Sequence, residues 1–232
     1  TTQSAMVSLP TLGEAGVAVV GASLWTQPAN AWLPAAHALP WPAAPYATQA
    51  EAEQQALEQL RIYEHWETGG HARILRSAAA LDDHLRRFDE DRVPGLVIGL
   101  EGADPVDGPD GLAVWWERGV RSIGLAWSTT RYAGGTGSSV ALTDAGRELL
   151  VAMAEQGLVH DVAHLSEEAF WEAVGLPHHA LCASHVNPRA RLLPPPGVRT
   201  AIPLNRFLSD AQLREVGRPR GATSGGMVGL SL

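Results

Sequence analysis

The feature that most constrains this chain is a regular alternation of short apolar runs with helical stretches. Apolar runs rich in valine, leucine and isoleucine recur at intervals of roughly 20 to 30 residues, with helical segments between them. Such runs predict six strands, at 17–25, 96–100, 121–127, 158–163, 180–184 and 227–232. Because parallel strands need a crossover between them, this alternation predicts an α/β fold with a parallel sheet.

The predicted helices carry clear start and stop signals. Thr48 and Ser166 are N-cap residues, and Gly69–Gly70 ends the first long helix. Helices are expected at 49–68, 79–87, 111–117, 143–156, 166–174 and 209–216. Residues 26–47 contain five prolines and predict an irregular excursion rather than a helix or strand, and a second proline-rich loop is expected at 194–196.

Two α/β architectures fit this alternation, and the residues at the strand ends distinguish them. No G-x-G-x-x-G motif follows the first strand, which excludes the usual dinucleotide-binding fold. Glu101, His164 and His185 instead follow three different strands. The C-terminal strand ends of a barrel converge on one mouth, so these positions favour a (β/α)8 TIM barrel. Since a closed barrel needs about eight strands, we expect residues 1–232 to form a single barrel domain with a metal site, whose first and last strands are missing.

Composition excludes several other kinds of site. All 17 basic residues are arginine, so a P-loop, Schiff-base chemistry and a metal pair bridged by carbamylated lysine are excluded. The net charge of −8 argues against nucleic acid or an anionic membrane as a partner. Cys182 is the only cysteine, which excludes an intrachain disulfide and a thiolate zinc cluster. Its apolar neighbours predict a buried, inert thiol.

The three strand-end residues have the chemistry of a zinc site. Histidine nitrogens and a carboxylate suit zinc, which commonly takes three protein ligands and one water molecule in catalytic sites. Bound zinc lowers the pKa of water to about 7, and a bridging carboxylate can hold a second metal ion about 3.5–4 Å away. Because lysine is absent, Glu101 is the candidate bridging group.

The remaining histidines and loop residues have mainly structural interpretations. His160 lies four residues before His164, about 13 Å along a strand, so the two cannot share one ion. Trp127 ends a predicted strand, where it either lines the pocket or packs in the core. Residues 134–137 are glycine-rich and predict a mobile active-site loop rather than a phosphate loop. The other histidines are assigned no role and are expected in loops, on polar helix faces or at the far end of the barrel: His37, His65, His71, His84, His178 and His179.

Several motifs in register carry a resemblance to a known family. They span most of residues 7–232 and lie at 100–104 (LEGAD), 118–121 (RGVR), 124–127 (GLAW), 142–147 (LTDAGR), 160–164 (HDVAH), 183–185 (ASH) and 205–210 (NRFLSD). In these stretches the chain resembles the bacterial branch of the membrane dipeptidase (renal dipeptidase) family of zinc peptidases.

The resemblance implies a (β/α)8 barrel with two zinc ions that hydrolyses dipeptides through a hydroxide bridging the two metals. Glu101 matches the bridging carboxylate of the family, and His164 and His185 match the two histidines of the second zinc ion. Arg206 matches the arginine that binds the terminal carboxylate of the substrate, for which a planar guanidinium is well suited. Trp127 is the further candidate for substrate binding.

The chain also departs from the pattern of the family. The His-x-Asp strand that supplies the first zinc ion and the aspartate of the last strand are both absent, and Trp127 stands where many animal members have a histidine. Two alternatives therefore stay open. One is a related barrel hydrolase acting on N-acyl amino acids or lactones, and the other is a non-catalytic member of the family.

The expected partner is a small dipeptide, with neither nucleic acid nor membrane as a partner. A homodimer stays open, because the sequence does not define an oligomeric state. A cytoplasmic location is expected, since no signal peptide and no C-terminal anchor signal is visible in these residues. The first residue is threonine, so an N-terminal signal outside this sequence stays open as well.

Overall fold

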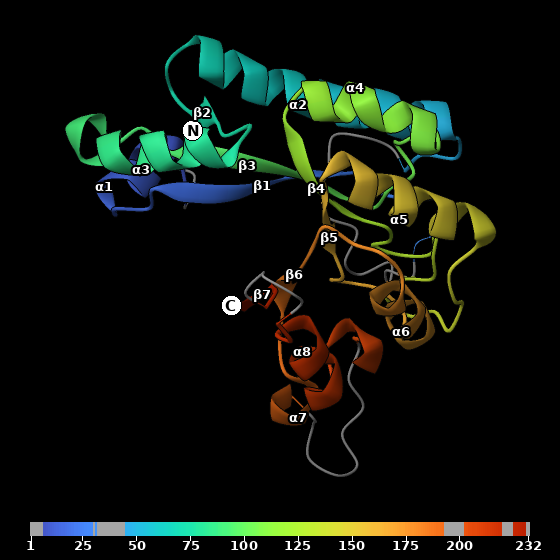
Figure 1. Ribbon diagram of the computed structural model, residues 1–232. Helices are drawn as coiled ribbons and strands as arrows, with labels where there is room; N and C mark the ends of the chain where they lie inside the picture. Colours follow the sequence, from blue (N-terminus) through green and yellow to red (C-terminus); the bar gives the residue numbers. More distant parts are fainter. Residues whose placement is uncertain (1–6, 30, 32–44, 193–201, 220–224, 231–232) are drawn as a thin grey trace, which may run out of the picture.

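The strands of this protein form one parallel sheet (Figure 1). The computed structural model describes residues 7–29, 31, 45–192, 202–219 and 225–230. The strands are β1 Val19–Trp25, β2 Arg73–Ile74, β3 Gly95–Glu101, β4 Val120–Gly124, β5 Val159–Asp161, β6 Ala180–Val186 and β7 Met227–Leu230. They follow the order β1-β3-β4-β5-β6-β7, and β2 pairs with the start of β3. The predicted parallel α/β architecture is confirmed.

The sheet curls, and the longer helices lie along its outer side (Figure 1). The helices are α1 Leu9–Glu14, α2 Gln49–Thr68, α3 Ala78–Asp91, α4 Leu112–Glu117, α5 Asp144–Gln156, α6 Glu167–Gly175, α7 Arg189–Leu192 and α8 Asp210–Val216. Two 3-10 turns complete the described elements: η2 Pro109–Gly111 and η3 Leu204–Arg206. This curled sheet with outer helices is part of a (β/α)8 barrel, as expected.

Two predicted strands end earlier than expected because side chains turn the backbone. The strands predicted at 121–127 and 158–163 end at Gly124 and Asp161. After β4, the hydroxyl of Thr130 donates to a backbone carbonyl five residues earlier, at 2.8 Å. After β5, the carboxylate of Asp161 accepts the backbone N–H two residues later, at 3.0 Å. Both turns carry the chain out of the sheet at the C-terminal end of the barrel.

Short elements are the ones that the sequence pattern missed. Helix α1 begins at a reciprocal capping box between Ser8 and Thr11, and β2 has only two residues. Neither segment is long enough to show a hydrophobic period. The expected proline-rich loop at 194–196 and His37 lie outside the described residues.

His84 corrects one further expectation. It does not lie on a polar helix face: it is buried, and its Nε2 lies 2.7 Å from the carbonyl oxygen of Ala18. His84 and Phe88 are four residues apart on α3, so they share the face that packs against the sheet, with their rings 5.9 Å apart. A histidine on the inner stripe of an amphipathic helix has no sequence signal that separates it from a surface histidine.

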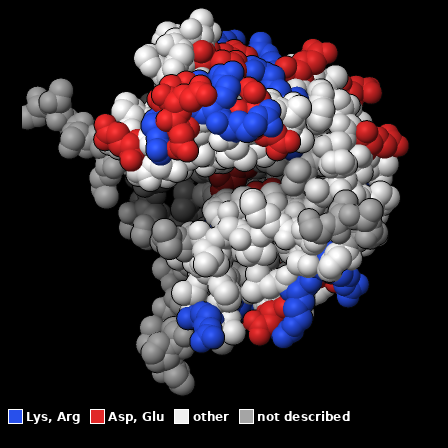
Figure 2. Space-filling view, turned by 60° about the vertical axis from the view of Figure 1, so that its left-hand side comes forward, with Lys and Arg blue, Asp and Glu red and all other residues white. Residues whose placement is uncertain are grey.

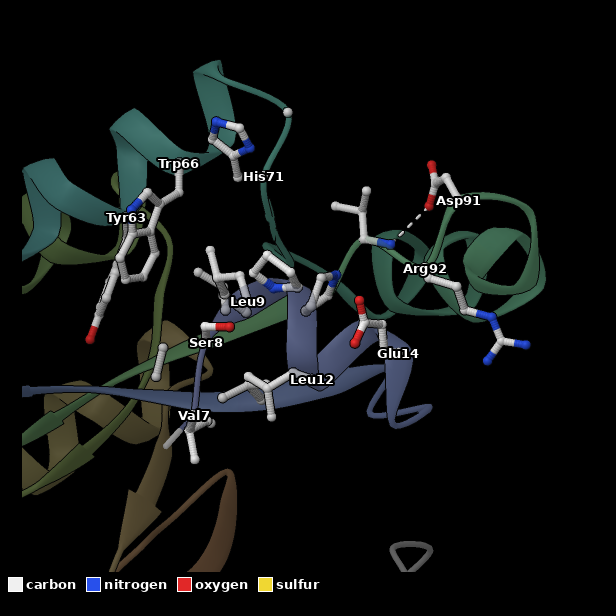
Figure 3. Close-up of a pocket in the computed structure, with 18 of the residues that line it drawn as sticks. Val7, Ser8, Leu9, Leu12, Glu14, Tyr63, Trp66, His71, Asp91 and Arg92 are labelled. Carbon is white, nitrogen blue, oxygen red and sulfur yellow. Dashed lines mark hydrogen bonds between the residues drawn. The ribbon is translucent and has the colours of Figure 1, made fainter. Parts of the chain in front are cut away.

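Of the cavities along the sheet, one lies at its β1 edge and another on its inner side. The larger one, about 1100 Å³, lies between α1, α2 and β1 and is lined mainly by apolar side chains such as Leu9, Tyr63 and Trp66 (Figure 3). The second, about 410 Å³, is floored by small inward-facing residues of the strands, among them Gly99 and Ser122. Glu101 and His185, two of the three residues expected to bind metal, line this second cavity.

The surface helices carry charges of both signs. Figure 2 shows acidic and basic side chains interspersed over the outer helices, above a hollow with acidic atoms at its floor. On α3 and at its C-cap the charges form ion pairs, with Arg87 3.3 Å from Asp83 and the C-cap residue Arg92 2.9 Å from Asp89. In the described part of the chain, no helix combines the length and the hydrophobicity needed to cross a bilayer.

Candidate metal centre

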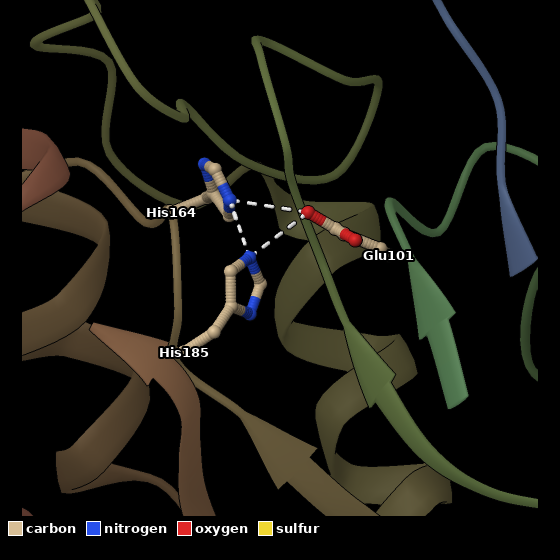
Figure 4. A group of neighbouring side chains, drawn as sticks. All are labelled: Glu101, His164 and His185. Atoms are coloured by element: carbon tan, nitrogen blue, oxygen red, sulfur yellow. Dashed lines mark hydrogen bonds and ion pairs between the residues drawn. The ribbon is translucent and has the colours of Figure 1, made fainter. Parts of the chain in front are cut away.

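Three side chains from three strand ends meet at the C-terminal end of the barrel (Figure 4). Oε1 of Glu101 lies 3.1 Å from Nε2 of His164 and 3.1 Å from Nε2 of His185. The two Nε2 atoms lie 3.0 Å apart. Glu101 ends β3, His164 follows β5 and His185 belongs to β6. The order of strands in the sheet therefore brings together residues that are up to 84 positions apart in the sequence.

Glu101 is held as a charged carboxylate by its neighbours. Its Oε2 accepts a hydrogen bond of 3.0 Å from the hydroxyl of Ser23 on β1. Burial alone would raise the pKa of Glu101, but the two histidine side chains beside it, His164 and His185, outweigh burial and hold the pKa well below its usual range. The carboxylate therefore stays ionised at neutral pH and can bind a cation.

His164 is held in an uncommon backbone conformation. Its φ of 69° lies in the left-handed region, which residues other than glycine rarely adopt. Its Nδ1 lies 2.9 Å from the hydroxyl of Thr136, which is almost fully buried. Burial lowers the pKa of His164 to about 4, despite the opposing effect of Glu101. The ring is therefore neutral at pH 7 and keeps a lone pair for a ligand.

The glycine-rich segment 134–137 supports this histidine. It was expected to be a mobile loop over the site, but here it packs tightly against its surroundings. A Cβ at Gly134 would lie 2.0 Å from the carbonyl oxygen of Val140, and one at Gly135 would lie 2.4 Å from that of Ser128. Only glycine allows this close approach of two backbones, and it places Thr136 beneath His164.

The donor set at this centre fits a divalent metal ion. One carboxylate oxygen and two imidazole nitrogens converge within 4.8 Å of one another. Two nitrogens and one oxygen are the ligands of common three-residue catalytic zinc sites, which leave a position for water. Within the described ranges, one group of three possible ligands lies this close together. The second zinc ion implied by the resemblance stays an expectation.

The two expected substrate-binding residues lie beside this centre. Arg206, in η3, donates from Nη2 to the carbonyl oxygen of His185 at 2.7 Å. Its Nη1 is buried and has no hydrogen-bond partner among the described residues. Trp127 is half-buried, with its ring 6.1 Å from that of His164 and 5.0 Å from that of Trp25. Each therefore lies against one of the two histidines of the centre.

His160 and Cys182 do not join the centre. His160 is buried within the sheet, where burial and then the charge of His178 lower its pKa to about 3. Cys182 is buried, and burial together with the charge of Asp161 raises the pKa of its thiol far above the usual range. The predicted burial of this thiol is confirmed, and a raised pKa disfavours the thiolate, which is the reactive form.

Sequence reasoning missed the residues that hold the ligands in place. These supporting residues are Ser23, Thr136, Asp161 and Ser184. Asp161 and Ser184 lie within three positions of a candidate ligand, so their polar side chains beside predicted strand ends were a usable signal. Ser23 and Thr136 are distant in sequence from the residues that they contact and had no such signal.

Thr136 gives a first prediction. Thr136→Val keeps the shape of the side chain but leaves Nδ1 of His164 without its partner. We expect zinc affinity to fall about tenfold, since residues that orient metal-binding histidines contribute 10- to 100-fold. Competition titration with a zinc-binding dye measures the affinity, and Thr136→Ser, which keeps the hydroxyl, is the control. Equal affinities of the valine and serine variants would contradict the prediction.

Comparison with known proteins identifies a family and individual proteins that are similar to this chain. The model of the family described as membrane dipeptidase, peptidase family M19, matches residues 2–219. An uncharacterized protein in the pqqA 5′ region of Klebsiella pneumoniae is 34% identical over 177 residues, which are 71% of this chain and 57% of that protein. An uncharacterized protein in the PQQ-III 3′ region of Acinetobacter calcoaceticus is 28% identical over 79% of this chain and 56% of its own length.

Solved structures show the same similarity. A metallopeptidase from Rhodobacter sphaeroides, with a bound phosphinate mimic of the dipeptide L-Ala-D-Ala, has a TM-score of 0.73 and 25% identity. It is matched over 97% of this chain and 64% of its own. A structure described as the dipeptidase AC of family M19 has a TM-score of 0.71 and 25% identity, over 97% of this chain and 62% of its own. This chain therefore spans less than two thirds of the length of these relatives.

Proposed function

The chain belongs to the membrane dipeptidase family, peptidase family M19, and from that premise we propose that it carries the zinc-binding centre of a dipeptidase. Its family is one of metallopeptidases, and dipeptidases are among its structural relatives. The observation that carries the proposal is the convergence of Glu101, His164 and His185 at the mouth of the barrel. The dipeptide substrate and zinc as the metal are part of this proposal.

In this proposal the three residues hold zinc through Oε1 of Glu101 and Nε2 of each histidine. Zinc supplies a water molecule of lowered pKa and a Lewis acid for a peptide carbonyl. The protein keeps the ligands ready: Ser23 holds the carboxylate by its second oxygen, and burial keeps His164 neutral. No reorganisation of these side chains is then needed when a substrate arrives.

Arg206 would bind the terminal carboxylate of the dipeptide. Its Nη1 is buried without a partner in the described part of the chain, and a buried N–H of a cation favours an anionic acceptor. Its hydrogen bond to the carbonyl of His185 holds the guanidinium next to a zinc ligand. This arrangement would place the peptide bond near the metal and the carboxylate at the arginine. Trp127 would form one wall of the pocket.

Metal analysis and a substrate panel test the proposal. The full-length gene product is purified, its zinc content is measured, and it is offered dipeptides, N-acyl amino acids and lactones. We expect bound zinc and faster hydrolysis of dipeptides than of the other classes. Preferred hydrolysis of N-acyl amino acids or lactones would replace the proposed substrate, and a zinc-loaded protein inactive on all three classes would indicate a non-catalytic member.

Arg206 gives a second prediction. Arg206→Met removes the charged donor, and kcat/KM for dipeptides is expected to fall about 10- to 100-fold, because hydrogen bonds to charged groups contribute about 1.5–3 kcal/mol. Dipeptide amides, which lack the carboxylate, are the control substrates. The wild type should prefer free dipeptides over their amides, and the variant should not. A preference that survives the substitution would rule out this role for Arg206.

A further inference from the structure

A chain of hydrogen bonds leads from the interior of the barrel to His185. Asp161 ends β5, and its backbone is in register with Cys182 on β6, which brings its carboxylate close to Ser184 two residues further on. The hydroxyl of Ser184 lies in short hydrogen-bond contact with Oδ2 of Asp161. The same hydroxyl lies 2.7 Å from Nδ1 of His185.

The direction of each hydrogen bond follows from the number of protons. A carboxylate only accepts, so the single proton of the Ser184 hydroxyl points to Asp161. The oxygen of Ser184 is then left as the acceptor towards Nδ1 of His185, and this nitrogen must carry a proton. In a neutral imidazole the other nitrogen, Nε2, then has a free lone pair.

We propose that Asp161, acting through Ser184, fixes His185 as the Nδ1–H tautomer and so keeps its Nε2 free to bind metal. This inference rests on the zinc centre of the proposed function and adds two positioning residues to it. Nε2 of His185 lies 3.1 Å from Oε1 of Glu101. In this tautomer neither atom carries a proton, so a lone pair of the nitrogen faces a lone pair of the oxygen. That arrangement favours a cation between them.

Asp161 also has a structural contact, and an amide at this position would preserve it. Its Oδ1 accepts the backbone N–H groups of Ala163 and Ser184, each at 3.0 Å. In Asp161→Asn the amide oxygen must take the place of Oδ1, because an NH2 group there would face two donors. The NH2 group must therefore face Ser184 and donate to its oxygen. The hydroxyl proton of Ser184 is then left with Nδ1 of His185 as its acceptor.

Asp161→Asn is therefore expected to invert the tautomer of His185 while the fold is kept. The proton moves to Nε2, the atom that faces Glu101 and His164. We expect zinc affinity to fall about 10- to 100-fold, the range found when partners of metal-binding histidines are changed. Ser184→Ala, which removes the link, is expected to weaken zinc binding in the same range, whereas Ser184→Thr keeps the hydroxyl and should bind zinc nearly as the wild type does.

The experiment measures tautomer and zinc affinity without any substrate. Ring nitrogen shifts of 15N-histidine-labelled, metal-free full-length protein report the tautomer, and the signal lost in His185→Gln assigns His185. Zinc affinity is measured by competition titration, with Asp91→Asn, at an exposed ion pair with Arg73, as the matched control. Nδ1–H in the wild type and Nε2–H in Asp161→Asn would support the proposal.

An unchanged tautomer in Asp161→Asn, or an Nε2–H tautomer in the wild type, would overturn it. If Asp161→Asn does not fold, as judged by circular dichroism, the comparison of Ser184→Ala with Ser184→Thr decides the question, and equal zinc affinities of these two variants would overturn the proposal. A protein that binds zinc with this dependence on Asp161 and Ser184 but hydrolyses no dipeptide would contradict the proposed function alone.

Discussion

Glu101→Gln should abolish tight zinc binding and lower kcat/KM for dipeptides by about three orders of magnitude, because a catalytic metal ion contributes several kcal/mol to transition-state stabilisation. Oε1 of Glu101 is the only atom in this centre that contacts both histidine Nε2 atoms and carries negative charge. An amide has the same shape but no charge, and its NH2 group can donate hydrogen bonds to the Nε2 atoms of the histidines. Zinc content by mass spectrometry and dipeptide turnover measure the two effects.

Glu117→Gln is the matched control for this substitution. Glu117 ends α4 and is exposed, so its loss of charge should leave both zinc content and turnover unchanged. A Glu101→Gln protein that retains stoichiometric zinc and wild-type turnover would refute both the metal centre and the proposed function. Circular dichroism of both variants shows whether a loss of zinc binding arises from unfolding.

Gly146→Ala is expected to cause a large loss of stability. A Cβ at this position, in the first turn of α5, would lie 2.1 Å from the backbone oxygen of Tyr132. Backbone cannot yield as a flexible side chain does, so α5 or the loop of Tyr132 must shift. We expect a loss of about 3 kcal/mol in the free energy of unfolding, and a fall of roughly 10 °C in Tm for a domain of this size.

The same substitution should weaken zinc binding. Tyr132 is buried and donates from its hydroxyl to the carbonyl of Val106, and it anchors the loop that continues to Thr136. Gly175→Ala is the control, since a Cβ at the end of α6 would meet nothing within 4 Å. That variant should be within about 0.5 kcal/mol of the wild type. Equal stabilities of the two alanine variants would show that the contact at Gly146 is relaxed at little cost.

The main elements were predictable because their sequence signals are local. The helix at 49–68 has the same bounds in the structure, since Thr48 and Glu51 form a capping box at its start and glycine follows its end. Six strands were found from their apolar runs, with errors only at their ends, and the two-residue strand β2 was missed. The ends of β4 and β5 depend on hydrogen bonds from Thr130 and from the carboxylate of Asp161, which a pattern of apolar residues does not contain.

The ligands of the site were predictable for a different reason. In a parallel α/β fold, residues at the C-terminal ends of strands share one rim, so strand prediction alone placed Glu101, His164 and His185 on that rim. Their supporting residues were not predictable in this way. Ser23 and Thr136 reach the site from another strand and from a loop, and their distance in sequence from their partners conceals the contact.

The sequence by itself determined the class of fold, the family and the three ligand-type residues. Strand–helix alternation, the order of the motifs and side-chain chemistry can all be read directly from the residues. Only the tertiary structure decided the electronic state of these ligands. The burial that keeps His164 neutral, and the contacts that link Asp161 through Ser184 to His185, depend on distances between neighbouring strands and loops. Such distances are set by sheet register and packing, which no single segment of the sequence specifies.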